Sequence, residues 1–426
     1  MPPATVNADL GIRSGLRTLA RVARERWLLP AAARIEARQD RSGLAADDPG
    51  TDRVLPALMA WMCRAQDRSK FGDGGVARDF SLLRGWASSY PETTGYIVPT
   101  FLDVARRAGD ADLRARALRM ADWLVTIQLD SGAFQGGKID SRPVVEVTFN
   151  TGQILLGLAA AQAETGRYLL PMQRAADWLV HTQDADGCWR RYQSPFAAYG
   201  DKEYETHVAW GLFEAARVEP NRGYGEAGLS NIRWALSSLT SNGWFARCCL
   251  DDPTRPLTHT LGYALRGVLE AHRFACDPTF LQASQRTADG LMGAMHDDGF
   301  LPGRLNADWS PAAPWTCLTG TAQIAHCWML LHQLTGRADY MKAASIACRY
   351  VRRSVRLDGP LDTRGGVKGS FPVDGEYGRY EYLNWAAKFL ADALLLERDI
   401  RDDEIAAQPA GLAVAAPANL TARSAN

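Results

Sequence analysis

Three absences narrow the classes of protein to which this chain of 426 residues belongs. Charge of one sign is not in surplus: 48 Lys and Arg stand against 48 Asp and Glu, whereas partners of a nucleic-acid backbone usually carry a basic excess. No apolar run reaches transmembrane length, and the start of the chain lacks the continuous apolar stretch of a signal peptide. We therefore expect a cytoplasmic protein without a nucleic-acid partner.

The cysteines give no indication of a bound metal. Eight are present, none in a Cys-x-x-Cys pair, and no cluster with histidine has the spacing of a zinc site. Reduced, mostly structural thiols in a cytoplasmic protein fit this pattern. We predict no metal and no other cofactor.

The chain does contain an internal repeat. A tryptophan is followed nine positions later by a glycine at Trp123/Gly132, Trp178/Gly187 and Trp234/Gly243, at intervals of about 55 residues. A looser copy precedes these (Trp61, then Gly74), and two degenerate copies follow (Gly290/Gly299 and Tyr350/Gly359). Six copies of one helix–turn–helix unit would fill nearly the whole chain.

Each unit predicts two helices of different character. The first carries an apolar stripe and ends in a turn of Gly with Asp or Asn, such as DADGCW at 184–189. The second follows a loop of roughly 20 residues and is apolar on most sides. We expect its N-cap to be Thr or Asn, at Thr94, Asn150, Thr206, Thr258, Thr319 and Asn384.

Alternating amphipathic and apolar helices favour two concentric rings. We predict an all-α fold, an (α/α)6 toroid of six helical hairpins, over 51–400. An open solenoid is the alternative, and it would expose two apolar ends. Residues 1–50 are expected to add an N-terminal helical extension, with Leu10, Leu16 and Trp27 near helical spacing, and 401–426 a disordered tail.

The third unit, RAADWLVHTQDADGCW (Arg174–Trp189), resembles the QW repeat of the squalene–hopene cyclase and prenyltransferase superfamily. The chain from about 50 to 400 is similar to bacterial (α/α)6 proteins with prenyltransferase/squalene-oxidase-like repeats encoded among exopolysaccharide-biosynthesis genes. The resemblance rests on the segments 73–100, 258–271 and 365–397. It implies a role in surface-polysaccharide synthesis and specifies no reaction.

Terpene-cyclase chemistry is not implied, because its acidic motifs are missing. Protonation of an alkene in that family needs DxDD, and ionisation of a diphosphate needs DDxxD to hold magnesium. The chain has neither motif; its Asp-Asp pairs at 47–48, 251–252, 297–298 and 402–403 lack the spaced partner. A lanthionine-cyclase-like zinc set of two Cys and one His is absent as well.

In such a toroid all six inner helices begin at one rim, where their N–H groups and positive dipole ends favour anions such as uronates or phosphates. The loops entering these helices are rich in aromatic and acidic residues, so we expect the binding site in the funnel that they form. Four titratable residues at or near the helix starts are the catalytic candidates: Glu92, His207, His259 and Tyr382.

Each candidate has a structural alternative. Glu92 either faces the substrate or only caps its helix. His207 and His259 occupy equivalent places in consecutive units, so they act as acid and base on opposite faces of a sugar carbon or form structural hydrogen bonds. Tyr382 is an acid or base if an arginine lowers its pKa, and otherwise it packs or stacks on a sugar.

The same loops supply residues for substrate binding. The candidates are Trp86, Tyr90, Tyr96, Asn150, Tyr204, Trp309, Trp315, Glu376, Arg379, Tyr380 and Asn384. Arg379 pairs with a substrate carboxylate or neutralises a neighbouring glutamate. Trp309 and Trp315 form stacking walls or plain core, and for Asn150 the N-cap interpretation is the stronger one.

Three functions compete at this stage. The first is a carbohydrate-active enzyme of exopolysaccharide synthesis that acts on a uronate-containing glycan or a lipid-linked sugar, by hydrolysis, β-elimination or epimerisation. The second is an isoprenoid enzyme with an apolar, aromatic-lined cavity. The third is a non-catalytic glycan-binding scaffold. Peripheral contact with membrane-bound polysaccharide machinery would reconcile a cytoplasmic enzyme with a nascent polymer.

Overall fold

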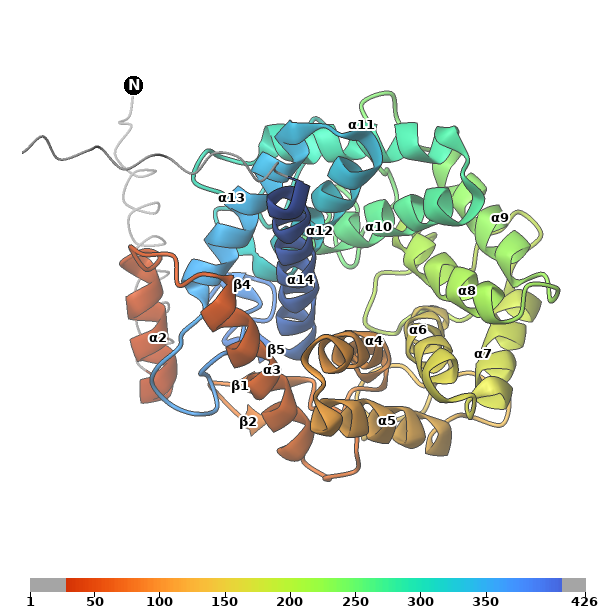
Figure 1. Ribbon diagram of the computed structural model, residues 1–426, viewed down its shortest axis with the longest axis horizontal. Coiled ribbons are helices and arrows are strands. Elements are labelled where there is room, and N and C mark those ends of the chain that lie inside the picture. Colours follow the sequence, from red (N-terminus) through yellow and green to blue (C-terminus); the bar gives the residue numbers. More distant parts are fainter. Residues whose placement is uncertain (1–27, 408–426) are drawn as a thin grey trace, which may run out of the picture.

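The computed structural model describes residues 28–407, which form a double ring of helices with α2 (Ala31–Arg41) packed outside it (Figure 1). The outer helices are α3 (Thr51–Asp67), α5 (Ala111–Thr126), α7 (Leu169–Thr182), α9 (Tyr224–Leu236), α11 (Pro278–Ala294) and α13 (Ala338–Ser354). The inner helices are α4 (Pro91–Ala108), α6 (Thr148–Thr165), α8 (Thr206–Val218), α10 (Thr258–Ala275), α12 (Leu318–Thr335) and α14 (Asn384–Ala407). The segment from Leu10 to Trp27 lies outside the described residues.

The inner ring is closed. Consecutive inner helices contact one another from α4 to α14, and α14 contacts α4 in turn (Figure 1). Asn384 Nδ2 donates hydrogen bonds to the Ala77 carbonyl oxygen (2.9 Å) and to Thr93 Oγ1 (2.8 Å), while Thr100 Oγ1 donates to Asp392 (2.7 Å). The predicted closed toroid of six hairpins is confirmed, and the open solenoid is excluded.

The repeated glycine explains how neighbouring hairpins fit together. Gly74, Gly132, Gly187, Gly243, Gly299 and Gly359 all have φ between 82° and 103°, which side chains rarely adopt. These turns also press on the next outer helix: a Cβ at Gly187 would lie 2.5 Å from the Ser230 carbonyl oxygen of α9. In the last unit Gly365 takes this role: a Cβ added there would lie 2.2 Å from the Ala57 carbonyl oxygen of α3.

The glutamine of the QW-like pattern has a structural role. The Gln183 amide nitrogen donates to the carbonyl oxygens of Gly187 in its own turn and Ala227 in the next outer helix, both at 3.0 Å. Gln128 makes the same pair of bonds, at 2.9 Å each, and Gln66 bonds likewise in the first unit. Because buried carbonyl groups need donors, this residue joins consecutive units.

The predicted N-caps of the inner helices are wrong. Thr94, Asn150 and Thr319 lie inside the first turn and Thr206, Thr258 and Asn384 begin their helices, while the caps of α4, α6, α8, α10 and α12 form no side-chain cap bond. First-turn threonines instead bond the preceding loop: Thr94 Oγ1 accepts from the Val76 N–H and Thr151 Oγ1 from the Phe134 N–H, both at 3.0 Å. The incoming loop competes successfully for these hydroxyls.

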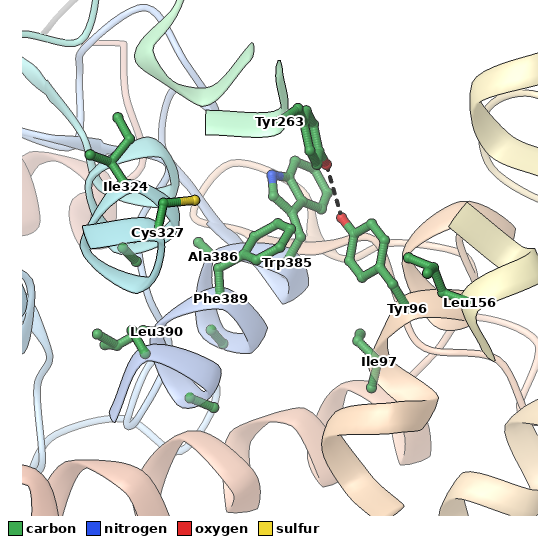
Figure 2. Close-up of a cluster of buried hydrophobic side chains, with 14 of the residues drawn as sticks. Tyr96, Ile97, Leu156, Tyr263, Ile324, Cys327, Trp385, Ala386, Phe389 and Leu390 are labelled. Atoms are coloured by element: carbon green, nitrogen blue, oxygen red, sulfur yellow. Dashed lines mark hydrogen bonds between the residues drawn. The ribbon is translucent and has the colours of Figure 1, made fainter. Parts of the chain in front are cut away.

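Aromatic side chains fill the middle of the ring. Tyr96 of α4, Tyr263 of α10 and Phe389 of α14 lie close together there (Figure 2), with ring centroids 5.3 Å apart for Tyr96–Phe389 and 5.9 Å for Tyr263–Phe389. The two tyrosine hydroxyls are 3.5 Å apart. The Lys388 ammonium lies 4.5 Å from the Phe389 ring and pairs with Asp392 at 2.6 Å. The rings interact through their faces and edges and so close the toroid centre.

Short strands connect the first and last loops at the rim. Strands β1 (Asp79–Ser81), β2 (Gly85–Trp86) and β5 (Glu381–Leu383) form a sheet of order β2-β1-β5, in which Ser81 opposes Glu381. Strands β3 (Thr316–Cys317) and β4 (Ser370–Phe371) pair antiparallel. Because β5 runs directly into α14, its register sets which side chains of the last loop face the ring axis.

Helix α2 is fastened by a buried ammonium. Lys368 Nζ lies 2.8 Å from Glu36 and 2.5 Å from Asp40, and Asp40 also accepts the Val373 N–H at 2.8 Å. At the other end, α14 runs to Ala407, past the boundary expected at residue 400, and the rest of the expected tail lies outside the described residues. Among residues 28–407, none of the helices combines the length and apolarity that a membrane span requires.

Candidate active site

A cavity of about 840 Å³ opens at the end of the ring where the inner helices begin. First-turn residues of α4, α6, α10 and α14 line it together with the loops that enter them. Its charged and titratable lining consists of Lys70, Arg78, Asp79, Arg84, Glu92, Lys138, Asp140, His259 and Glu381. Its aromatic lining consists of Trp86, Tyr90, Phe149, Phe196, Tyr204, Tyr263, Tyr377 and Trp385.

Glu92, in the first turn of α4, is the acid with the most altered protonation in this lining. Removal from water raises the pKa of its carboxyl to about 7, against the opposing effects of a hydrogen bond with the Tyr90 hydroxyl and the charge of Arg78. Burial and the neighbouring Glu92 raise the pKa of Tyr90 as well, so that hydroxyl keeps its proton. Glu92 therefore keeps a proton at mildly acidic pH and is about half protonated at pH 7.

Arg78 joins the sheet to the cavity wall. Its Nη1 lies 2.6 Å from Asp79 and 2.9 Å from Glu381, and Arg84 also pairs with Glu381. Burial lowers the pKa of Arg78, but the two carboxylates outweigh this and raise it overall. Its guanidinium lies 5.1 Å from the Trp385 ring. Both carboxylates of the sheet are thus neutralised by arginine.

His259, in the first turn of α10, has a defined tautomer. Its Nδ1 lies 2.6 Å from the Gln323 side-chain oxygen, which only accepts hydrogen bonds, so Nδ1 carries the hydrogen and Nε2 is an acceptor. Burial lowers the pKa of His259 to about 4, against the opposing effect of Gln323. Rings of Tyr263 and Tyr377 lie 4.4 Å and 5.2 Å away. This imidazole is neutral at neutral pH and lines the cavity.

His207 is not part of the lining. It is fully buried, bonded through Nδ1 to Gln153 at 2.6 Å, and its ring lies 4.5 Å from Tyr263, the ring that does line the cavity. Burial, together with the charges of Arg266 and Lys388, lowers its pKa well below the usual value. The expectation that His207 and His259 face one sugar carbon is therefore incorrect for His207: one ring turns to the cavity and the other to the core.

Solved structures with the same architecture exist. A heparin-specific unsaturated glucuronyl hydrolase is 17% identical with a TM-score of 0.66, over 83% of this chain and 99% of that chain. A D-mannose isomerase is 12% identical (TM-score 0.66; 83% and 99%), and a sugar epimerase from a ruminal bacterium 11% (0.67; 81% and 97%). No protein-family model and no curated protein matches the chain. The likeness shows the fold.

Tyr382 and Tyr96 also lie outside the lining. Side chains alternate along a strand, so Glu381 faces the cavity and Tyr382 faces the opposite side. Burial raises the pKa of Tyr382, and the charge of Glu36 of α2 raises it further. Tyr382 therefore cannot serve as the acid or base expected of it. Tyr96 is buried, and its hydroxyl lies 3.5 Å from the hydroxyl of Tyr263, which lines the cavity (Figure 2).

The remaining candidates of the last loop have structural partners. Glu376 is exposed and pairs with Arg304 at 3.2 Å, and the Arg379 guanidinium lies 5.5 Å from the Tyr380 ring. Tyr380 is buried at a φ of 62°. Asn384 joins α14 to α4 as described above. None of the four lines the cavity, although Tyr377 of the same loop does.

Trp309 and Trp315 pack with residues of the protein core and do not form stacking walls for a substrate. Trp309 lies edge-on to Trp244, with ring centroids 5.1 Å apart, and donates to the Asn242 carbonyl oxygen at 3.1 Å. Trp315 is buried with Leu257 and Cys317. Neither lines the cavity.

Four binding candidates do line it: Trp86, Tyr90, Asn150 and Tyr204. Trp86 is half-buried and fixed by a bond from Nε1 to Asp362 (3.0 Å). The Asn150 amide nitrogen is buried and has no protein partner among the described residues, so it has a hydrogen bond to offer a ligand. Asn150 is therefore not the N-cap of α6.

Sequence reasoning missed Arg78, Tyr263 and Trp385, which share the cavity with Glu92 and His259. Tyr263 follows His259 by four positions on one helix, a spacing that places both on the same face. That spacing could have identified Tyr263 from the sequence. Arg78 had none, because its position depends on the pairing of β1 with β5 across the closure of the ring.

Proposed function

We propose that this protein is a carbohydrate-active enzyme that moves a proton at a carbon of a uronate-containing glycan. The observation that carries the proposal is that one cavity lined by aromatic rings contains both Glu92, an acid whose pKa is raised to about 7, and His259, a neutral base of fixed tautomer. Acid and base groups with pKa values shifted away from their ordinary range mark functional sites.

The chemistry follows from the two protonation states. The hydrogen on the carbon next to a uronate carboxyl is the acidic one, and His259 Nε2 accepts it as a proton. Glu92 then donates its proton, either to the leaving oxygen, which gives β-elimination, or to the opposite face of the same carbon, which gives epimerisation. Both outcomes leave Glu92 ionised and His259 protonated, and solvent restores them.

Hydrolysis by two carboxylates is less well supported. It requires a second free carboxylate across the scissile bond. The other lining carboxylates are engaged: Asp79 and Glu381 with Arg78, and Asp140 with Ser88 at 2.7 Å. Sugar epimerases and unsaturated glucuronyl hydrolases both occur among the structural neighbours, so the fold accommodates either chemistry.

Recognition of a uronate is supported by cations at the mouth. Lys138 lines the cavity and has no ion-pair partner among the described residues, and Arg84 is 71% exposed. The charge of Lys138, which also lowers the pKa of Asp140, attracts an anionic substrate and holds its carboxylate. The unpartnered amide of Asn150 adds a donor for a sugar oxygen.

The isoprenoid alternative is weaker. Aromatic rings in the lining favour it, but nine charged or titratable side chains share that lining, and carbocation chemistry calls for an apolar enclosure. We further place the reaction in exopolysaccharide synthesis, on the resemblance of the sequence. We place it in the cytoplasm, where the eight free thiols would stay reduced, with the glycan as nascent polymer or lipid-linked sugar.

The proposal is tested by incubating the protein with a panel of uronate polysaccharides and lipid-linked sugars. Absorbance of unsaturated uronates reports elimination, reducing ends report hydrolysis, and deuterium uptake without cleavage reports epimerisation. Glu92→Gln and His259→Asn are expected to lower kcat by about 10²- to 10⁴-fold, the usual contribution of an acid or base.

Glu226→Gln is the matched control, because Glu226 is also a first-turn acid but sits on the outer helix α9 and is exposed. It should retain full activity. Silence in all three assays with retained glycan binding would favour the scaffold function and refute the enzyme.

A further inference from the structure

Exposed aromatic side chains are concentrated at the mouth of the cavity. Among residues 28–407 the aromatic residues with large exposed surfaces are Phe71 (53%), Phe196 (62%) and Tyr199 (91%). Phe196 lines the cavity itself, Tyr199 follows it on the same loop, and Phe71 follows Lys70, another lining residue. Exposed apolar rings gathered beside a pocket are characteristic of a binding surface.

The loop that carries Phe196 and Tyr199 is held against the rim. The Phe196 ring covers Gly137, where a Cβ would come within 2.8 Å of it. The Ala198 N–H donates to the Leu250 carbonyl oxygen at 2.7 Å, and the Gly200 N–H donates to Gln193 at 3.1 Å. The backbone is thus anchored on both sides of Tyr199 while its ring faces solvent.

Two lysines of the cavity lining, Lys70 and Lys138, accompany these rings. Lys70 Nζ is 5.2 Å from the Phe71 ring and 3.6 Å from Asp140, and Lys138 lies in the same lining without an ion-pair partner. Pyranose rings present C–H faces that stack on aromatic rings, and uronate carboxylates pair with ammonium groups.

We propose that Phe71, Phe196 and Tyr199 form an outer subsite, the aromatic rim, for the sugar residues of an acidic glycan chain that extend beyond the cavity. This inference rests on the proposed function and specifies its substrate class: a chain longer than the cavity holds. A cavity of about 840 Å³ has the size of a site for one small ligand, so a polymer bound there leaves through the mouth and crosses the rim.

The rim makes affinity depend on chain length. Each stacked ring contributes about 2- to 10-fold, so sugars added outside the cavity strengthen binding until the rim is covered. Short ligands, which occupy only the cavity, do not reach Phe71 and Tyr199, the rim residues outside its lining.

The test measures binding by calorimetry, using ladders of two to eight sugar residues cut from hyaluronan, alginate and polygalacturonate. Wild-type affinity should increase with length for at least one ladder. The double variant Phe71→Ala/Tyr199→Ala, which changes only rim residues outside the cavity lining, should lose that increase and bind the disaccharide normally. Leu170→Ala is the matched control, because Leu170 is 67% exposed at the start of the outer helix α7 and does not line the cavity.

The outcomes separate this inference from the proposed function. Affinity independent of length, or a double variant that binds long chains like the wild type, overturns the aromatic rim whatever the enzyme does. Loss of length dependence in a protein without activity upholds the rim and refutes the enzyme. Failure to bind any ladder overturns both.

Discussion

Glu92 and His259 are held away from their ordinary protonation, and this sets an expected pH profile. Proton transfer needs Glu92 protonated, which holds below its pKa of about 7, and His259 neutral, which holds above its pKa of about 4. Activity should therefore rise through about pH 4, plateau, and fall through about pH 7. A rate–pH titration checks this, and activity that still climbs above pH 8 would contradict the assignment of the acid.

The same carboxyl should influence folding stability. Glu92 has a folded pKa of about 7 against an ordinary value of 4.5, so the folded state binds more protons between these values and stability falls as pH rises through that window. Glu92→Gln removes the ionisation. Because Glu92 is only partly buried, we expect the variant to gain up to about 2 kcal/mol over wild type at pH 8 and nothing at pH 4. Denaturant titrations at the two pH values measure the difference.

Gln323 should act as a positioning residue for His259. Gln323→Leu removes the acceptor of Nδ1–H, so the tautomer is no longer fixed and kcat should fall roughly 10- to 100-fold. Nitrogen-15 NMR of labelled histidine should show the two ring-nitrogen shifts of His259 converging. Gln153→Leu is the control, because it releases His207 only. Unchanged His259 shifts in Gln323→Leu would refute the role.

At the scale of the element, the glycine turn that follows an outer helix is the part where a substitution should lower stability most. Gly187→Ala combines a φ of 95° with a Cβ placed 2.5 Å from the Ser230 carbonyl oxygen, so α7 and α9 must separate. We expect a loss of at least about 2 kcal/mol, seen as a lower Tm. Gly223→Ala is matched, with a φ of 76° and nothing within 4 Å, and should cost about 1 kcal/mol. Equal losses would mean that backbone strain alone matters.

At the scale of the molecule, the closed ring should unfold as one unit. Each hairpin shares its core with both neighbours, and Asn384 binds the last inner helix to the first. Asn384→Ala leaves the Ala77 carbonyl oxygen without its side-chain donor, so the midpoint of a single calorimetric transition should fall by an amount equivalent to about 1–3 kcal/mol. Two separate transitions, in wild type or variant, would contradict a shared core.

Much of the architecture was predictable from local signals. Each hairpin turn needs a glycine at positive φ, and this requirement is local to the turn. The Trp–Gly period therefore predicts six hairpins from the sequence. The helix starts were less predictable. Thr94 looks like a cap, yet its hydroxyl, like that of Thr151, accepts a hydrogen bond from the N–H group of an incoming loop that sequence does not place.

The site residues, too, were predictable only where a local signal marks them. Glu92, His259 and Asn150 were found because they lie in the first turns of inner helices, and Tyr204 because it directly precedes one; all inner helices begin at one rim. His207 also begins one, but the rotation of α8 about its axis turns the ring into the core. Helix rotation is set by packing against α6 and α10, which no local pattern encodes.

From the chain alone one derives six hairpins, a closed ring and a rim where the inner helices start, because periodicity and turn chemistry are short-range. Which side chains meet in the cavity was decided by long-range contacts. The pairing of β1 with β5 brings Arg78 to Glu381 and sends Tyr382 to α2. Strands nearly the whole chain apart pair only after the ring has closed, and a shift of one residue in their register would exchange those two faces.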